Sequence, residues 1–142
     1  RPLSVRPATV GASRPLAEKI TAVQGAALSP DGKTFALACH DGTIVLADSE
    51  KGRVVRKIAA HKVRAWSVAW SPDGKHLLTA AGPWDRMDGA GEARVWSVET
   101  GKMTRDLKGL NGLGQCAAWS RDGKRAAVCQ SNGEVLLYDT SS

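Results

Sequence analysis

Three histidines are the residues of this sequence best suited to acid–base chemistry or metal binding. We expect His40 and His61 on one face of the molecule and His76 beside a turn on the opposite face. A zinc site needs at least three protein ligands. No third ligand stands at a supporting spacing, so we assign the histidines structural or solvated positions and predict no metal site.

A serine nucleophile is the other chemistry to test, because Ser67 lies close to His61 in the sequence. Such a nucleophile also needs a third group that orients the histidine, and donors for the oxyanion. Neither is apparent, and no G-x-S-x-G elbow, P-loop or G-x-G-x-x-G motif follows an expected strand. We therefore predict no catalytic residues, no cofactor and no enzyme activity.

Three cysteines, Cys39, Cys116 and Cys129, form an odd set without CxxC spacing. Each lies within or at the end of an apolar run, which is typical of small buried thiols rather than metal ligands. The set favours a reducing compartment such as the cytoplasm. Nothing else in the sequence indicates a location.

Composition limits the possible partners. The 142 residues suffice for one ordinary domain, and 42% hydrophobic with 24% charged residues is a globular mixture. The net charge is +6, but lysines and arginines are scattered among the turns. This indicates a solvated basic surface rather than a groove for nucleic acid. No apolar stretch approaches the ~18 residues of a membrane helix. We predict neither a nucleic-acid nor a membrane partner.

One phrase of five residues occurs three times and reveals the organisation of the chain. Its copies are Ser29–Lys33, Ser71–Lys75 and Ser120–Lys124, which begin 42 and 49 residues apart. Apolar runs precede and follow each copy, and turns containing Asp-Gly or Asn-Gly separate further runs. The predicted strands are 23–28, 34–39, 43–48 and 53–58, then 65–70, 76–81, 93–97 and 102–107, then 115–119, 125–129 and 134–139. No segment shows a helical period, so we predict an all-β fold.

This pattern resembles the WD40 repeat family over roughly residues 14 to 139. The resemblance implies β-propeller blades of four antiparallel strands, three of them in this chain. The usual Trp-Asp pair reads Ala47-Asp48, Trp96-Ser97 and Tyr138-Asp139 here, and Ala60 precedes His61. The family's His-Asp-Trp hydrogen-bond network is therefore expected to be incomplete, with packing more important for stability.

The resemblance also sets domain limits and structural residues. We expect an N-terminal extension at 1–13 and blades at about 14–59, 60–108 and 109–142. An aromatic residue repeated at the ends of equivalent strands indicates packing between blades rather than a platform for stacking bases. The predicted structural residues of the repeat are Asp31, Gly32, Asp73, Gly74, Asp122, Gly123, Trp70, Trp119 and His61.

The extra seven residues of the second repeat lie between its second and third strands, in the segment 82–92. Insertions in repeats map to loops on one face, often the binding face. We assign partner binding to Trp84, Asp85, Arg86, Met87 and Asp88, residue types that include those enriched at interfaces. A loop without a binding role is the alternative. The acidic residues do not follow the EF-hand pattern of a calcium loop.

These features predict a non-catalytic scaffold for protein–protein interaction whose partners include copies of itself. Three blades cannot surround a channel, because propellers use about 4–8. We expect residues within 4–20 of one copy to supply a fourth strand to the last blade of another, in a register that needs a gap of about four. Two copies would give six blades, and three copies, the less favoured arrangement, nine. The alternative is a regulatory or ligand-sensing propeller module from a larger multidomain protein.

Overall fold

The computed structural model describes residues 15–85 and 90–141, which form eleven β-strands. The first blade contains β1 (Val23–Leu28), β2 (Thr34–Cys39), β3 (Thr43–Asp48) and β4 (Val54–Ala59). The second contains β5 (Ala65–Trp70), β6 (His76–Ala81), β7 (Glu92–Ser97) and β8 (Met103–Leu107). The third contains β9 (Gly114–Trp119), β10 (Arg125–Gln130) and β11 (Val135–Asp139). Within these ranges no helix is long and apolar enough to cross a membrane.

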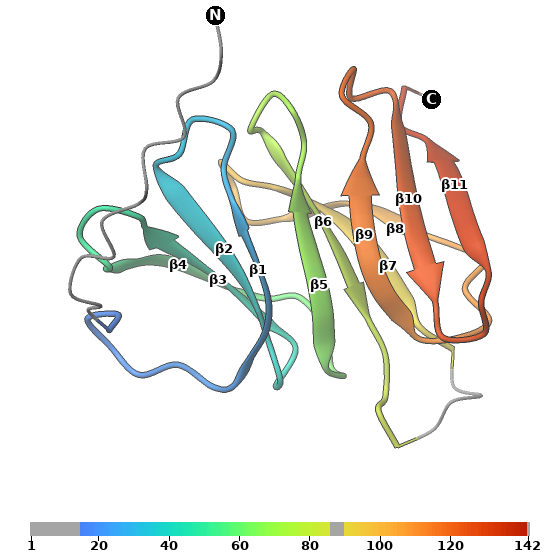
Figure 1. Cartoon of the computed structure of the whole chain (residues 1–142), viewed down its shortest axis with the longest axis horizontal. Helices are drawn as coiled ribbons and strands as arrows, with labels where there is room; N and C mark the ends of the chain where they lie inside the picture. Colours follow the sequence, from blue (N-terminus) through green and yellow to red (C-terminus); the bar gives the residue numbers. More distant parts are fainter. Residues whose placement is uncertain (1–14, 86–89, 142) are drawn as a thin grey trace, which may run out of the picture.

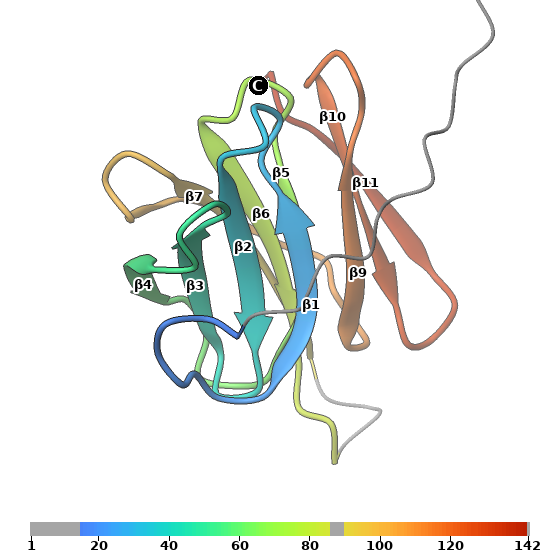
Figure 2. The ribbon, with the colours of Figure 1, turned by 60° about the vertical axis from the view of Figure 1, so that its left-hand side comes forward.

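Each blade is one antiparallel sheet whose strands follow chain order, with four, four and three strands. The predicted all-β fold of blades with antiparallel strands is confirmed, and every predicted strand end lies within one residue of its observed position. In Figures 1 and 2 the three sheets fan out with β1, β5 and β9 as neighbours. The β1–β2, β5–β6 and β9–β10 turns share one face, here called the turn face. The β2–β3, β6–β7 and β10–β11 connections, with the segments that join blades, form the loop face.

The repeated phrase forms the same hydrogen-bonded turn in each blade. Ser29 Oγ donates to Asp31 Oδ1 at 2.6 Å, and the Lys33 amide donates to the same carboxylate oxygen at 3.0 Å. These hydrogen bonds lower the pKa of Asp31 because they stabilise its ionised form. Gly32 has a φ of +75°, a conformation that costs a side chain energy. The phrase is therefore fixed by local turn chemistry.

Apolar clusters fill the two interfaces between blades. Trp70 and Trp119 are half-buried, each packed against the cluster between its own blade and the preceding one. Trp70 Nε1 donates to the Ala27 carbonyl at 3.0 Å, and Trp119 Nε1 donates to the Ala69 carbonyl at 3.3 Å. The equivalent tryptophans therefore link β5 to β1 and β9 to β5.

The end blades expose apolar side chains on the faces that point away from the second blade. Leu28 occupies the position equivalent to Trp70, yet it is 48% exposed, and its strand partner Phe35 is 37% exposed. On the third blade Val135 and Leu137 are 55% and 75% exposed. Both ends of the row of blades thus present uncovered apolar surface.

The segment 15–22 runs along the outward face of the first blade. Leu16 and Ile20 pack against the cluster of Leu37, Cys39 and Val45, and the Ala17 amide donates to the Gly52 carbonyl. Leu16 precedes the start of β1 by seven residues. Ile58 and Leu107 precede the starts of β5 and β9 by the same number. Leu16 lies 42 residues before Ile58, which needs no gap, and Ile20 lies 38 residues before it, which needs a gap of four. Both side chains pack on the same cluster, so the gap of about four stays a prediction.

Candidate functional site

A hydrogen-bonded network around His61 joins side chains of β6 and β7 in the second blade. Trp96 Nε1 donates to Thr79 Oγ1 at 2.9 Å, and Thr79 Oγ1 lies 2.7 Å from His61 Nε2. On the other side of the ring, His61 Nδ1 lies 2.6 Å from Glu92 Oε2. A neutral His61 that carries its proton on Nδ1 satisfies all three contacts, because the Thr79 hydroxyl can then donate to Nε2.

The network corrects one expectation. We expected the polar network to be incomplete, but in the second blade it runs unbroken from Trp96 to Glu92. The missing acidic residue of the Trp-Asp pair does not interrupt it, since Glu92 at the start of β7 supplies a carboxylate. Sequence reasoning missed Thr79, although it is a polar residue within an otherwise apolar stretch of β6.

The hydroxyl of Thr79, the ring of His61 and the carboxylate of Glu92 have the order of groups found in catalytic triads with a hydroxyl nucleophile. Thr79 is 0% exposed, so no substrate can reach its hydroxyl. Its oxygen also accepts the hydrogen bond from Trp96. Ser67, the other nucleophile considered, accepts a hydrogen bond from the Ala117 amide and thereby links β5 to β9. The arrangement is suited to stabilising the blade rather than to group transfer.

The His61 network should make stability depend on pH. Burial lowers the pKa of His61, although Glu92 acts to raise it. The unfolded chain therefore binds more protons than the folded chain as pH falls below about 6.5, and acid favours unfolding. The free energy of unfolding in urea should be lower at about pH 5.5 than at about pH 8. His61→Gln should remove most of this difference and His76→Gln should not; an undiminished difference in His61→Gln would assign it to another group.

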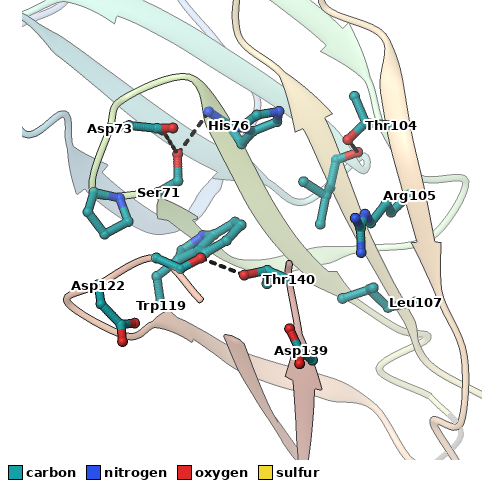
Figure 3. Close-up of a pocket in the computed structure, with 13 residues that line it drawn as sticks. Ser71, Asp73, His76, Thr104, Arg105, Leu107, Trp119, Asp122, Asp139 and Thr140 are labelled. Atoms are coloured by element: carbon teal, nitrogen blue, oxygen red, sulfur yellow. Dashed lines mark hydrogen bonds between the residues drawn. The ribbon is translucent and has the colours of Figure 1, made fainter. Parts of the chain in front are cut away.

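A pocket of about 680 Å³ opens on the turn face between the second and third blades. Figure 3 shows Ser71, Asp73 and His76 at its rim, a trio of the types found in serine hydrolases. The Ser71 hydroxyl donates directly to Asp73, and it accepts from the His76 backbone amide rather than from the ring. No histidine side chain activates this serine, and the same contacts recur in the other two turns.

The loop face carries a second polar group, built from three separate connections. The Arg64 guanidinium lies 4.9 Å from the centroid of the Trp66 ring and 5.3 Å from that of Trp84. Arg64 Nη2 donates to His40 Nε2 at 3.0 Å, and Trp66 Nε1 donates to the Gly82 carbonyl. We call His40, Arg64, Trp66 and Trp84 the arginine cluster. Sequence reasoning missed its first three members, because their contacts join segments that lie far apart in the chain.

The predicted partner-binding residues lie only partly in the described chain. Trp84 is 61% exposed on the loop face, and Asp85 follows it in an exposed turn. Arg86, Met87 and Asp88 lie outside the described residues. The structure thus brings Trp84, but no other residue assigned to partner binding in the described ranges, into the arginine cluster.

The described residues contain no group of three or more histidine, cysteine or acidic side chains placed to hold a metal ion. Cys39 is buried in the cluster on the outward face of the first blade. Cys129 is half-buried and pairs across the sheet with Cys116. Cys116 is exposed, so the expectation that all three thiols are buried is wrong for this one: its side of the third blade is uncovered.

Two family models match the chain. The model described as anaphase-promoting complex subunit 4 WD40 domain matches residues 13–73. The model described as WD domain, G-beta repeat matches residues 52–97. Together they cover residues 13–97, which contain the first blade and the first three strands of the second.

Curated relatives are longer proteins. Actin-interacting protein 1 of Drosophila melanogaster is 36% identical over 87 residues, which are 60% of this chain and 13% of that protein. WD repeat-containing protein 1 of Bos taurus is 33% identical over 100 residues, 66% of the chain and 15% of the relative. Apoptotic protease-activating factor 1 of Rattus norvegicus is 30% identical over 101 residues, 71% of the chain and 8% of the relative. The chain thus spans less than a sixth of the length of these relatives.

Proposed function

This chain belongs to the WD40 repeat family, and we propose that it acts as a non-catalytic scaffold that binds protein partners through its loop face. The exposed indole of Trp84 supports this proposal, since large apolar side chains exposed beside polar residues are typical of interaction sites. The buried position of Thr79 supports a structural rather than a catalytic role for the His61 network. We retain 14–59, 60–108 and 109–142 as the proposed blade limits.

We further propose that partners include a second copy of the chain, joined head to tail. The observation that carries this is the exposure of Leu28 and Phe35 at one end and of Val135 and Leu137 at the other. Burial of apolar surface stabilises by about 25 cal/mol per Å², so the two faces gain by covering each other. Two copies joined at both ends form a ring of six blades, within the usual range of about 4–8.

The path of segment 15–22 supports the same proposal. Leu16 and Ile20 contact the outward face of the first blade, much as Ile58 and Leu107 contribute to the clusters at the next two interfaces. In the described residues β11 is an edge strand of the third sheet. A segment placed beside the first blade of one copy can therefore pair with β11 of the other, and pairing would satisfy backbone groups that an edge leaves open.

The second candidate function is a regulatory or ligand-sensing propeller module of a larger protein. The lengths of the relatives favour it, since the matched part is 8–15% of each. In that arrangement further blades of the same chain would cover both ends. The two candidates differ in what meets the apolar faces, and not in the use of the loop face for partners.

Light scattering on the 142-residue chain tests the ring. We expect twice the monomer mass at micromolar concentration, and three times that mass would indicate nine blades. Leu137→Glu should give the monomer, because it places a charge on the buried face of the joint. Met103→Glu is the matched control, since Met103 is 48% exposed on the second blade, away from both ends, and this variant should remain a dimer. A folded wild-type monomer would contradict closure by self-association and favour the second candidate.

A further inference from the structure

The Arg64 side chain is held at the surface in one orientation. Two indoles lie within 4.9 and 5.3 Å of its guanidinium carbon, and His40 Nε2 accepts a hydrogen bond from Nη2. Such contacts orient a guanidinium before a ligand binds, so the side chain loses less conformational entropy on binding. Trp66 is itself fixed by its hydrogen bond to the Gly82 carbonyl, so the support is rigid on that side.

The charge of Arg64 is not balanced by the described residues. None of their carboxylates forms an ion pair with it, although lysine or arginine forms four such pairs elsewhere in the described chain. Arg64 Nε is also buried without a hydrogen-bond partner in this part of the chain. Because Nε is closed to solvent and one hydrogen of Nη2 binds His40, a ligand must use Nη1 and the other hydrogen of Nη2. The two acceptor oxygens of a carboxylate fit this pair of donors.

We propose that the arginine cluster binds one aspartate or glutamate side chain of a partner protein, with an apolar residue of the same partner segment against Trp84. The carboxylate accepts hydrogen bonds from Arg64, and the exposed indole supplies apolar contact area. The proposal rests on the scaffold function, because it names the chemistry of the partner that the loop face takes.

A single carboxylate fits this surface better than a chain of phosphates. Asp41 and Asp85 stand beside His40 and Trp84 on the same connections. The pKa of Asp41 is lowered by a hydrogen bond from the Thr43 amide, so its charge persists at neutral pH. The arginine cluster offers one arginine, and neither carboxylate forms an ion pair with it, whereas a nucleic-acid backbone relies on several cations together.

Titration with short peptides tests the site. The probe is an acetylated, amidated peptide of sequence Gly-Leu-Glu-Leu-Gly, followed by NMR of the arginine Nε–H and tryptophan indole N–H signals of the 142-residue chain. We expect shifts for Arg64, Trp66 and Trp84 with a dissociation constant on the order of 1 mM. The peptide with glutamine in place of glutamate should bind at least about tenfold more weakly, because a charge-assisted hydrogen bond is lost.

Matched variants separate this site from general charge attraction. Arg64→Gln should abolish the shifts at Trp84, and Trp84→Ala should weaken binding while Arg64 still responds. Arg121→Gln removes one positive charge from an exposed turn on the opposite face and should bind as the wild type does. Equal binding of both peptides, an equal loss in Arg121→Gln, or preferred binding of a thymidine oligonucleotide would each overturn the proposal. None of these outcomes changes the mass measured by light scattering, so the scaffold's self-association is judged separately.

Discussion

Thr79→Val should lower the free energy of unfolding by about 2–5 kcal/mol, although it changes the shape of the side chain little. Valine cannot accept the hydrogen bond of Trp96 Nε1 or donate to His61 Nε2, which lie 2.9 and 2.7 Å from the threonine oxygen. Both groups would remain in a site where Thr79 is fully buried and Trp96 is 7% exposed. A buried polar group left unpaired costs about 1–3 kcal/mol.

Urea unfolding at pH 8 measures this change, and Thr104→Val is its control. Thr104 lies exposed on β8, and its hydroxyl donates to the Val95 carbonyl at 3.2 Å. Because water can replace that hydrogen bond, the control should lose less than about 1 kcal/mol. A Thr79→Val variant as stable as the control would mean that packing alone stabilises the second blade, as the sequence had led us to expect.

Local turn chemistry made most of the fold predictable. The Ser-x-Asp-Gly-Lys phrase specifies its own hydrogen bonds within five residues, and the strands on either side follow from apolar alternation. For this reason the strand ends could be placed within one residue. The predicted start of β7 was one residue late, because the charged residue Glu92 was assigned to the preceding loop.

The candidate sites were harder to predict because they depend on contacts between distant segments. His61 meets Thr79 and Glu92, which lie 18 and 31 residues further along the chain. Arg64 meets His40 across a blade boundary. Residue types in one segment carry no signal for such pairs. The position of Trp84 in an insertion assigned it to a surface loop. Nothing in that segment indicated that its ring packs against the Arg64 guanidinium.

Gly42→Ala should destabilise the chain by about 3–5 kcal/mol, through a clash between blades. Gly42 has a φ of +86° in the β2–β3 turn. A Cβ atom there would lie 2.1 Å from the His61 carbonyl oxygen and 2.5 Å from that of Val63. Those oxygens belong to the segment that leads into the second blade, so the turn or that segment must move. A shift would also disturb the His61 amide, which donates to the Gly42 carbonyl.

Gly133→Ala separates the clash from the backbone conformation. Gly133 occupies the equivalent turn of the third blade with a φ of +87°, and a Cβ atom there would meet nothing within 4 Å. Alanine at this position should therefore cost only the left-handed conformation, about 1–2 kcal/mol. The difference in the free energy of unfolding in urea between the two variants then measures the cost of the clash between the β2–β3 turn and the segment that leads into the second blade. Equal losses would show that the backbone angle accounts for both, and that the two blades can separate there at little cost.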